Sequence, residues 1–116
     1  VNAPDRGDRG YKEANAELSR LVEKKIVWLE YDRYQDDPYG RLLAWVWIKC
    51  ESEPEFLAYD YMHKTGNESQ KGIRENPKGC EKGRLVNEEL ILKGLVKIET
   101  FKDRGELKYE RRLMDK

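Results

Sequence analysis

The stretch YGRLLAWVWI, residues 39–48, decides the fold of this chain. It completes a turn by its chemistry, Asp36-Asp37-Pro38-Tyr39-Gly40, in which aspartate supplies a side-chain acceptor and proline fixes its own φ. From Leu42 to Ile48 the chain is continuously apolar, which predicts a strand buried on both faces. Before the turn, Ile26 to Tyr31 is β-branched and aromatic and predicts a second strand. Together these segments predict a β-hairpin.

Helical patterns lie on either side of this hairpin. Tyr11, Ala14, Leu18, Leu21 and Val22 repeat at helical spacing, which predicts an amphipathic helix ending near residues 24 and 25, both lysines. After the hairpin, Asn87 is expected to cap a short helix with acidic residues in its first turn and Gly94 just past its end. A strand over residues 96–101 and a terminal helix over residues 106–114 complete the predicted elements.

Residues 49–83 differ from their surroundings, because four glycines and two prolines interrupt any long element. An apolar cluster, Phe56 to Met62, predicts a short packed segment within this insert. Short strands, short helices and hairpins without a strand–helix–strand rhythm predict an α+β fold.

Composition bounds the size and the charge of the molecule. With 116 residues the chain forms one domain at most, and 40% charged residues divide evenly into 23 basic and 23 acidic ones. This balance argues against binding nucleic acid by bulk positive charge, although a local basic cleft is compatible with it. No window approaches the roughly 18 consecutive apolar residues of a membrane span, so no membrane partner is expected.

Three pieces of the sequence, in this order, resemble the staphylococcal-nuclease-like (thermonuclease) family of calcium-dependent phosphodiesterases. They are Val1-Asn2-Ala3-Pro4-Asp5, Tyr39-Gly40-Arg41-Leu42-Leu43-Ala44-Trp45-Val46, and the run VNEELILKGLVKI at residues 86–98. The resemblance covers residues 1–48 and about 84–115, and it implies a single domain over 1–116 with an insert at about 49–83. The implied fold is an OB-fold-type β-barrel with about three helices packed around it. In the family about three strands precede the first piece, and these N-terminal strands are missing from this chain.

The resemblance assigns a role to Arg41 and Tyr39. In the family, the arginine of Tyr-Gly-Arg contacts the scissile phosphate, and a planar guanidinium suits this task because it binds phosphate oxygens in pairs. Tyr39 would lie at the rim, where it could stack on a base. The alternative is an exposed arginine at the entry of a strand, paired with Asp36 or Asp37.

The first piece implies the metal and water chemistry. The family pattern Asp-x-Pro-Glu reads here as Asn2-Ala3-Pro4-Asp5. Asn2 and the backbone carbonyl of Ala3 would contribute oxygens to Ca²⁺, with one negative charge fewer than in the family. Asp5 would activate the attacking water from a side chain one methylene shorter than glutamate. The alternative is that Asn2 and Asp5 are turn formers beside Pro4.

Cys50 and Cys80 bracket the insert, where the family has only a tight connection, so the resemblance implies that they are close in space. A disulfide between them would indicate an oxidising compartment or the cytoplasm of a hyperthermophile. The chain could therefore be secreted or, in a thermophile, cytoplasmic. The alternative is two unrelated thiols.

The function that the resemblance implies is calcium-dependent hydrolysis of single-stranded DNA or RNA. The alternative is a catalytically weak or inactive domain of the same fold that binds nucleic acid or protein. A third interpretation is self-association, in which a second copy supplies or exchanges the missing strands.

Overall fold

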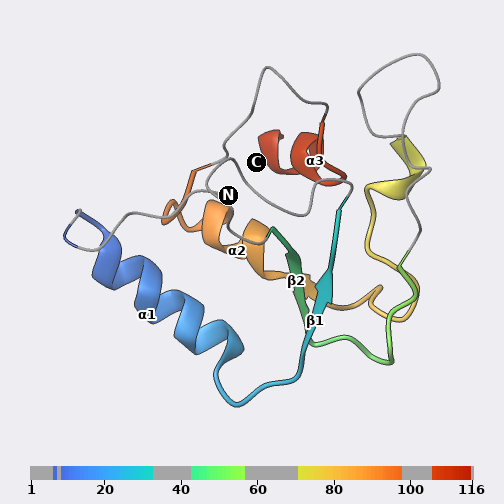
Figure 1. Ribbon diagram of the computed structural model, residues 1–116, viewed down its shortest axis with the longest axis horizontal. Coiled ribbons are helices and arrows are strands. Elements are labelled where there is room, and N and C mark those ends of the chain that lie inside the picture. The colour runs from blue at the N-terminus through green and yellow to red at the C-terminus, as the bar shows by residue number, and fades with distance from the viewer. Residues whose placement is uncertain (1–6, 8, 33–42, 57–70, 98–105, 116) are drawn as a thin grey trace.

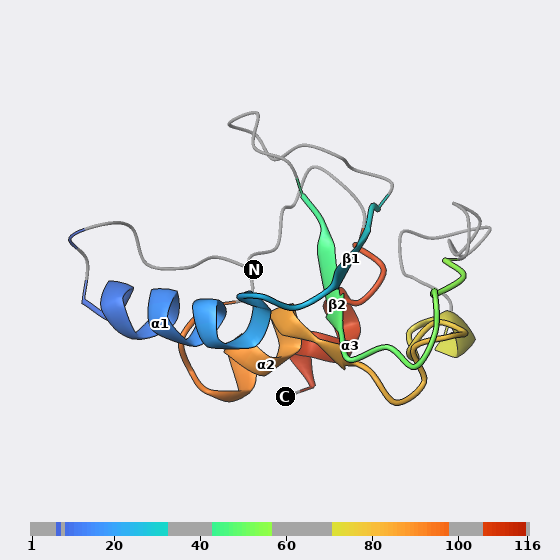
Figure 2. The same cartoon turned by 90° about the horizontal axis from the view of Figure 1, so that it is seen from below.

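The computed structural model describes residues 7, 9–32, 43–56, 71–97 and 106–115, and their arrangement is shown in Figure 1. The described part is an α+β fold with three helices and a three-stranded antiparallel sheet. The elements follow one another as α1 (Tyr11–Val22), β1 (Val27–Glu30), β2 (Trp45–Ile48), the 3-10 turn η1 (Lys71–Ile73), β3 (Arg84–Leu85), α2 (Val86–Leu92) and α3 (Glu110–Met114). In both views α1 and η1 lie at opposite ends of the molecule (Figures 1 and 2).

The predicted hairpin is confirmed. β1 and β2 pair antiparallel, with Trp28 opposite Trp47 and Glu30 opposite Trp45. Because side chains alternate along a strand, these four residues share one face of the sheet. The strand β2 is almost wholly buried, as its apolar run predicts, since Trp47 and Ile48 are 0% exposed.

The third strand, β3, was not predicted. It pairs with the other side of β2, with Trp47 opposite Leu85 and Ile48 opposite Arg84, so the sheet order is β1-β2-β3. Two residues are too short for an alternating pattern to be visible in the sequence. The pairing brings the two ends of the 49–83 insert together.

The helix α2 follows β3 directly. Its C-terminal end agrees with the prediction and its N-terminal end does not. Gly94, with φ of 69°, lies just past the C-terminus as expected; its N–H donates to Ile91 and the N–H of Leu95 donates to Leu90. These two bonds form a Schellman motif, which satisfies the last carbonyls of the helix. The expectation that Asn87 caps the helix is wrong, because the N-cap is Leu85 and the Asn87 side chain bonds to β2 instead.

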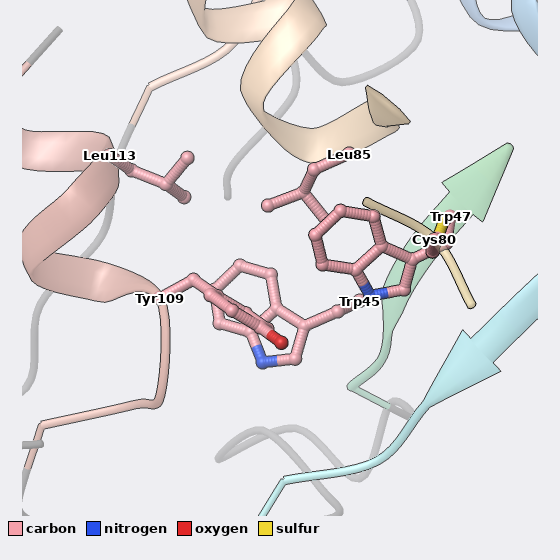
Figure 3. Close-up of a cluster of buried hydrophobic side chains, with 6 residues drawn as sticks. All are labelled: Trp45, Trp47, Cys80, Leu85, Tyr109 and Leu113. Carbon is pink, nitrogen blue, oxygen red and sulfur yellow. The ribbon is translucent and has the colours of Figure 1, made fainter. Parts of the chain in front are cut away.

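Two groups of buried side chains form the core. The first joins the Trp face of the sheet to the C-terminal segment, where Trp45 and Trp47 both meet the Tyr109 ring edge-on at 5.2 and 5.5 Å between centroids (Figure 3). The second lies where α1 and α2 pack on the sheet, and it consists of Leu21, Ile48, Val86, Leu90 and Val96. The two groups therefore bury opposite sides of β2.

The terminal helix is shorter than predicted. It begins at Glu110 rather than at residue 106, and the N–H of Glu110 donates to the carbonyl of Leu107, three residues back, which is a tighter turn than that of an α-helix. The N–H of Lys108 donates to Asp32, and the N–H of Leu107 donates to the Glu110 carboxylate. The helix α1 does match its prediction and ends at Val22, two residues before Lys24.

Several expectations fall on residues outside the described ranges. These are most of the strand over 96–101, and the part of the apolar cluster after Phe56. The described sheet is open, and closure into an OB-type barrel therefore stays a prediction. None of the described helices is both long and apolar enough to cross a membrane.

Candidate functional site

The residues that the sequence assigns to catalysis, substrate and metal lie outside the described ranges. They are Asn2, Ala3, Asp5, Tyr39 and Arg41. The structure instead describes the frame from which residues 33–42 leave β1 and return to β2. Tyr39 and Arg41 lie in the sequence between the two described ends of this frame.

Asp32 is the last described residue before this segment, and it is 2% exposed. Its Oδ2 accepts a hydrogen bond of 2.8 Å from the indole Nε1 of Trp45, the first residue of β2. The same oxygen accepts 2.8 Å from the backbone N–H of Lys108. One buried carboxylate thus joins both ends of the hairpin and ties them to the C-terminal segment.

Asn87 bonds to the N-terminal end of β2 from the side opposite to β1. Its Oδ1 accepts from the backbone N–H of Val46 at 2.9 Å, and its Nδ2 donates to the carbonyl of Ala44 at 3.3 Å. A primary amide that bonds one N–H and one C=O of a strand takes the place of a neighbouring strand. A small cavity of about 40 Å³ lies between the two anchors and is lined by Asp32, Leu43, Ala44, Trp45, Asn87 and Leu107.

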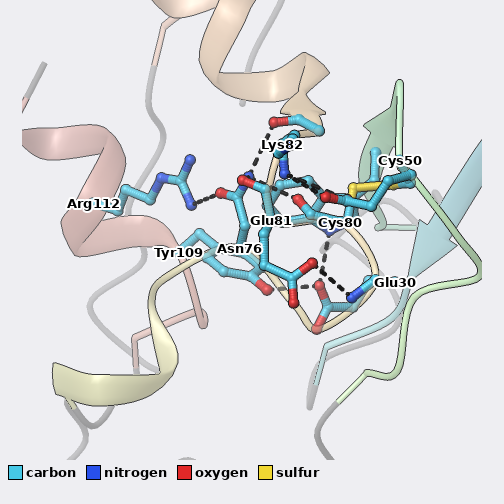
Figure 4. Close-up of a disulfide and its surroundings, with 12 residues drawn as sticks. Glu30, Cys50, Asn76, Cys80, Glu81, Lys82, Tyr109 and Arg112 are labelled. Carbon is cyan, nitrogen blue, oxygen red and sulfur yellow. Dashed lines mark hydrogen bonds between the residues drawn. A yellow bond between two sulfur atoms is a disulfide. The ribbon is translucent and has the colours of Figure 1, made fainter.

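A second buried carboxylate, Glu30, lies two residues before Asp32 on the same face. Its Oε1 accepts from Trp47 Nε1 at 3.0 Å and from the Tyr109 hydroxyl at 2.8 Å, and its Oε2 forms a buried ion pair with Lys108 Nζ. Figure 4 shows the Tyr109 hydroxyl directed at Glu30. Burial, followed by the charge of Glu30, raises the pKa of the Tyr109 hydroxyl above its usual value, so it stays a donor.

The sequence analysis does not identify Glu30 and Asp32 as buried anchors. The signal for them is their spacing within a segment otherwise rich in apolar residues. Two acids at i and i+2 point to the same face of a strand, and here they follow Trp28 on the face that is buried. Buried carboxylates require donors, so this pattern indicates a polar network.

The structure contains a disulfide between Cys50 and Cys80, the residues that the family resemblance implies are close in space, so of the two alternatives the paired one is observed. Beyond it, the two arms of the insert are linked by backbone bonds from Ser52 to Gly79 and from Glu55 to Lys78. Gly79 is required there, because a Cβ at this position would lie 2.5 Å from the carbonyl oxygen of Glu53. The described base of the insert is therefore a fixed part of the fold.

Asn76 and Arg112 fasten the insert to the helices (Figure 4). The Asn76 amide donates to the carbonyls of Cys80 and Gly83 at 2.9 and 3.0 Å, and its oxygen accepts from Arg112 at 2.9 Å. Arg112 also binds both carboxylate oxygens of Glu88 in α2, at 2.7 and 3.1 Å. An open groove of about 610 Å³ lies here, and Arg112 is one of the residues that line it. The Arg112 guanidinium is already bonded to Asn76 and Glu88.

The described residues do not supply a metal site of their own. Over the ranges that the structure covers, no three His, Cys, Asp or Glu side chains are grouped so that they could hold an ion. The oxygens expected for calcium, from Asn2 and Ala3, belong to the undescribed N-terminal residues. They are hard donors of the kind that Ca²⁺ prefers, but neither carries a charge.

Comparison with known proteins agrees with part of the resemblance. Over 47 residues the chain is 45% identical to the thermonuclease of Staphylococcus hyicus. This match covers 40% of the chain and 28% of that protein, so less than a third of the relative's length is represented. No protein-family model matches the chain, and no solved structure matches it significantly. A segment of this chain is thus similar to a thermonuclease, and the small α+β fold is compatible with that similarity.

Proposed function

We propose that this chain is a calcium-dependent phosphodiesterase that hydrolyses single-stranded DNA or RNA. The observation that carries the proposal is the 45% identity to a thermonuclease over 47 residues. The described residues on either side of positions 33–42, which contain Arg41 in the sequence, are held by the buried bonds of Asp32, Trp45 and Asn87, and this is compatible with the proposal.

Each proposed site residue has a task that its chemistry suits. Arg41 binds the non-bridging oxygens of the scissile phosphate and stabilises the negative charge that grows there as water attacks phosphorus. Asp5 accepts a proton from that water, and the bond from phosphorus to the leaving oxygen then breaks. Tyr39 stacks on a neighbouring base and orients the strand.

Asn2 and the Ala3 carbonyl would hold Ca²⁺ beside the phosphate. When bound, the ion adds positive charge where the phosphate charge develops. Because both donors are neutral, we expect weak calcium binding, which Asn2→Asp should tighten by adding a carboxylate ligand. The calcium concentration that gives half-maximal hydrolysis measures this, and an unchanged value in Asn2→Asp would contradict the assignment of Asn2.

The experiment that tests the proposal is hydrolysis of denatured DNA in calcium and in excess chelator. We expect cleavage in calcium only. The second candidate, a domain of the same fold that binds without cutting, is favoured by Asn2 in place of a charged ligand and by the zero net charge. It predicts salt-sensitive binding of single-stranded DNA without products in either condition.

Among the residues that the structure describes, β1 is an outer strand of the sheet, and this bears on the proposal of self-association. Val27 and Leu29 alternate along it, Tyr31 follows its end, and the three are 37%, 44% and 47% exposed. An edge strand with apolar side chains favours pairing with a second copy of the chain. This predicts an unfolding midpoint that rises with protein concentration, and a midpoint independent of concentration would contradict it.

A further inference from the structure

We propose that a groove beside the start of β1 binds single-stranded nucleic acid. A base stacks on Trp28, and phosphate oxygens bind the ammonium groups of Lys25 and Lys49. This binding site rests on the proposed function and deepens it, since its ligand is taken to be a nucleic acid. Its residues are different from Asp5 and Arg41, to which the proposed function assigns catalysis.

The groove lies at the end of the hairpin where α1 leads into β1 and the chain leaves β2 (Figure 1). At this end Val27 pairs with Ile48. The volume of the groove is about 420 Å³, which is within the range of sites that hold small ligands. It is therefore large enough to take part of a nucleic-acid strand.

The charge of the groove is positive. Lys25 and Lys49 line it together with one carboxylate, that of Glu53, in a chain whose net charge is zero. Among the residues that the structure describes, neither lysine belongs to an ion pair. The Lys25 ammonium donates to the Arg20 carbonyl at 3.3 Å, which leaves two of its three donors for a ligand. The groove is thus a local basic surface suited to phosphate oxygens.

Trp28 adds an aromatic surface beside these cations. It also lines the groove, and it is only partly buried, whereas Trp45 and Trp47 are 6% and 0% exposed. Proteins bind single strands by combining cations for the phosphates with an aromatic ring for a base, because every base has a π-face. This combination favours a nucleic acid over an acidic peptide, which would use the lysines alone.

Lys49 occupies its position with a strained backbone. Its φ is 58°, in the left-handed region that residues other than glycine rarely adopt, and such strain clusters at functional sites. Lys24 has a φ of 57° as well, but it is not among the described residues that line the groove. The two lysines form a matched pair, because glycine relieves the backbone strain at either position but removes a groove cation only at Lys49.

The test measures the affinity for a fluorescein-labelled oligothymidylate by anisotropy, in chelator and at several salt concentrations. Lys49→Gly should reduce the slope of log affinity against log salt by about 0.7, the contribution of one phosphate contact on a single strand. Lys24→Gly should leave the slope and the affinity unchanged. Both variants should unfold in urea near the wild-type midpoint, because glycine adopts a positive φ without steric cost.

Trp28→Leu tests the contact with a base. It should weaken the affinity by about tenfold with the salt slope unchanged, and Trp28→Phe, which keeps a ring, should restore most of the loss. Wild-type affinity in Trp28→Leu, a wild-type slope in Lys49→Gly or an equal change in Lys24→Gly would overturn the inference. Polyglutamate that binds with the same dependence on Trp28 would assign the groove to an acidic peptide and overturn it too.

Hydrolysis of denatured DNA in calcium by the same variants separates this site from the proposed function. Cleavage by the wild type, together with full affinity in Trp28→Leu and Lys49→Gly, would overturn the groove site and leave the nuclease intact. Binding that depends on Trp28 and Lys49 in a protein that does not cut would support the groove site and contradict the proposed hydrolysis.

Discussion

Removal of the Cys50–Cys80 disulfide should destabilise the protein substantially. The two cysteines are 30 positions apart. By the loop-entropy relation, a cross-link that closes about 30 residues restricts the unfolded chain by roughly 3–4 kcal/mol at 25 °C. The backbone bonds at residues 52–55 and 78–79 remain in the folded variant, so the loss should arise mainly in the unfolded state.

The assay is urea unfolding of the wild type and of Cys50→Ala/Cys80→Ala, under non-reducing conditions and with dithiothreitol. Reduced wild type serves as the control and should unfold close to the double variant. A difference in unfolding free energy below about 1 kcal/mol would refute the reasoning. So would a reductant that leaves the wild-type midpoint unchanged.

Two further predictions concern ion pairs. Lys108→Met leaves the Glu30 carboxylate buried without its cation, and should cost about 3–5 kcal/mol in urea unfolding; Glu30→Leu added to it should recover part of that loss. Hydrogen bonds from Arg20 and then Lys93 lower the pKa of Glu17 from 4.5 to about 2, so their stabilisation is complete above pH 4.5 and disappears as pH falls towards 2. Comparison of the wild type with Glu17→Gln across this range should show two stabilities that converge on acidification, and a constant difference would contradict it.

The elements predicted correctly are those whose signals are local. The period of α1, the apolar run of β2 and the glycine at the end of α2 each depend on a few neighbouring residues. The burial of β2 also agrees with the prediction, because an uninterrupted apolar strand must be covered on both sides.

The errors share a cause in tertiary contacts. Asn87 has the composition of a helix cap, but β2 lies close enough to take its amide. Residues 107–109 have a helical pattern, but they form a turn whose backbone is bonded to Asp32 through the N–H of Lys108, and the helix starts at Glu110. Neither partner can be identified from spacing, since Asp32 and Lys108 are 76 positions apart.

In the candidate site, too, some residues are implied by the sequence and others are identified only by tertiary contacts. The family resemblance implies Asn2, Asp5 and Arg41 as site residues, while the buried bonds of Asp32 and Asn87 are visible only in the folded arrangement. The sequence contains their signal in Glu30 and Asp32, two acids on the buried face of a strand. Their donors come from β2 and from the C-terminal segment, which only the fold brings together.

The measurement that tests the central claim most directly is the rate of denatured-DNA hydrolysis in calcium by the wild type, Arg41→Ala and Arg84→Ala. Arg84 is a matched control, because it is an exposed arginine on β3 that pairs with Glu89. The account predicts cleavage by the wild type and Arg84→Ala, and a loss of at least about 100-fold in Arg41→Ala. Equal rates in all three proteins, or no cleavage by the wild type, would contradict it.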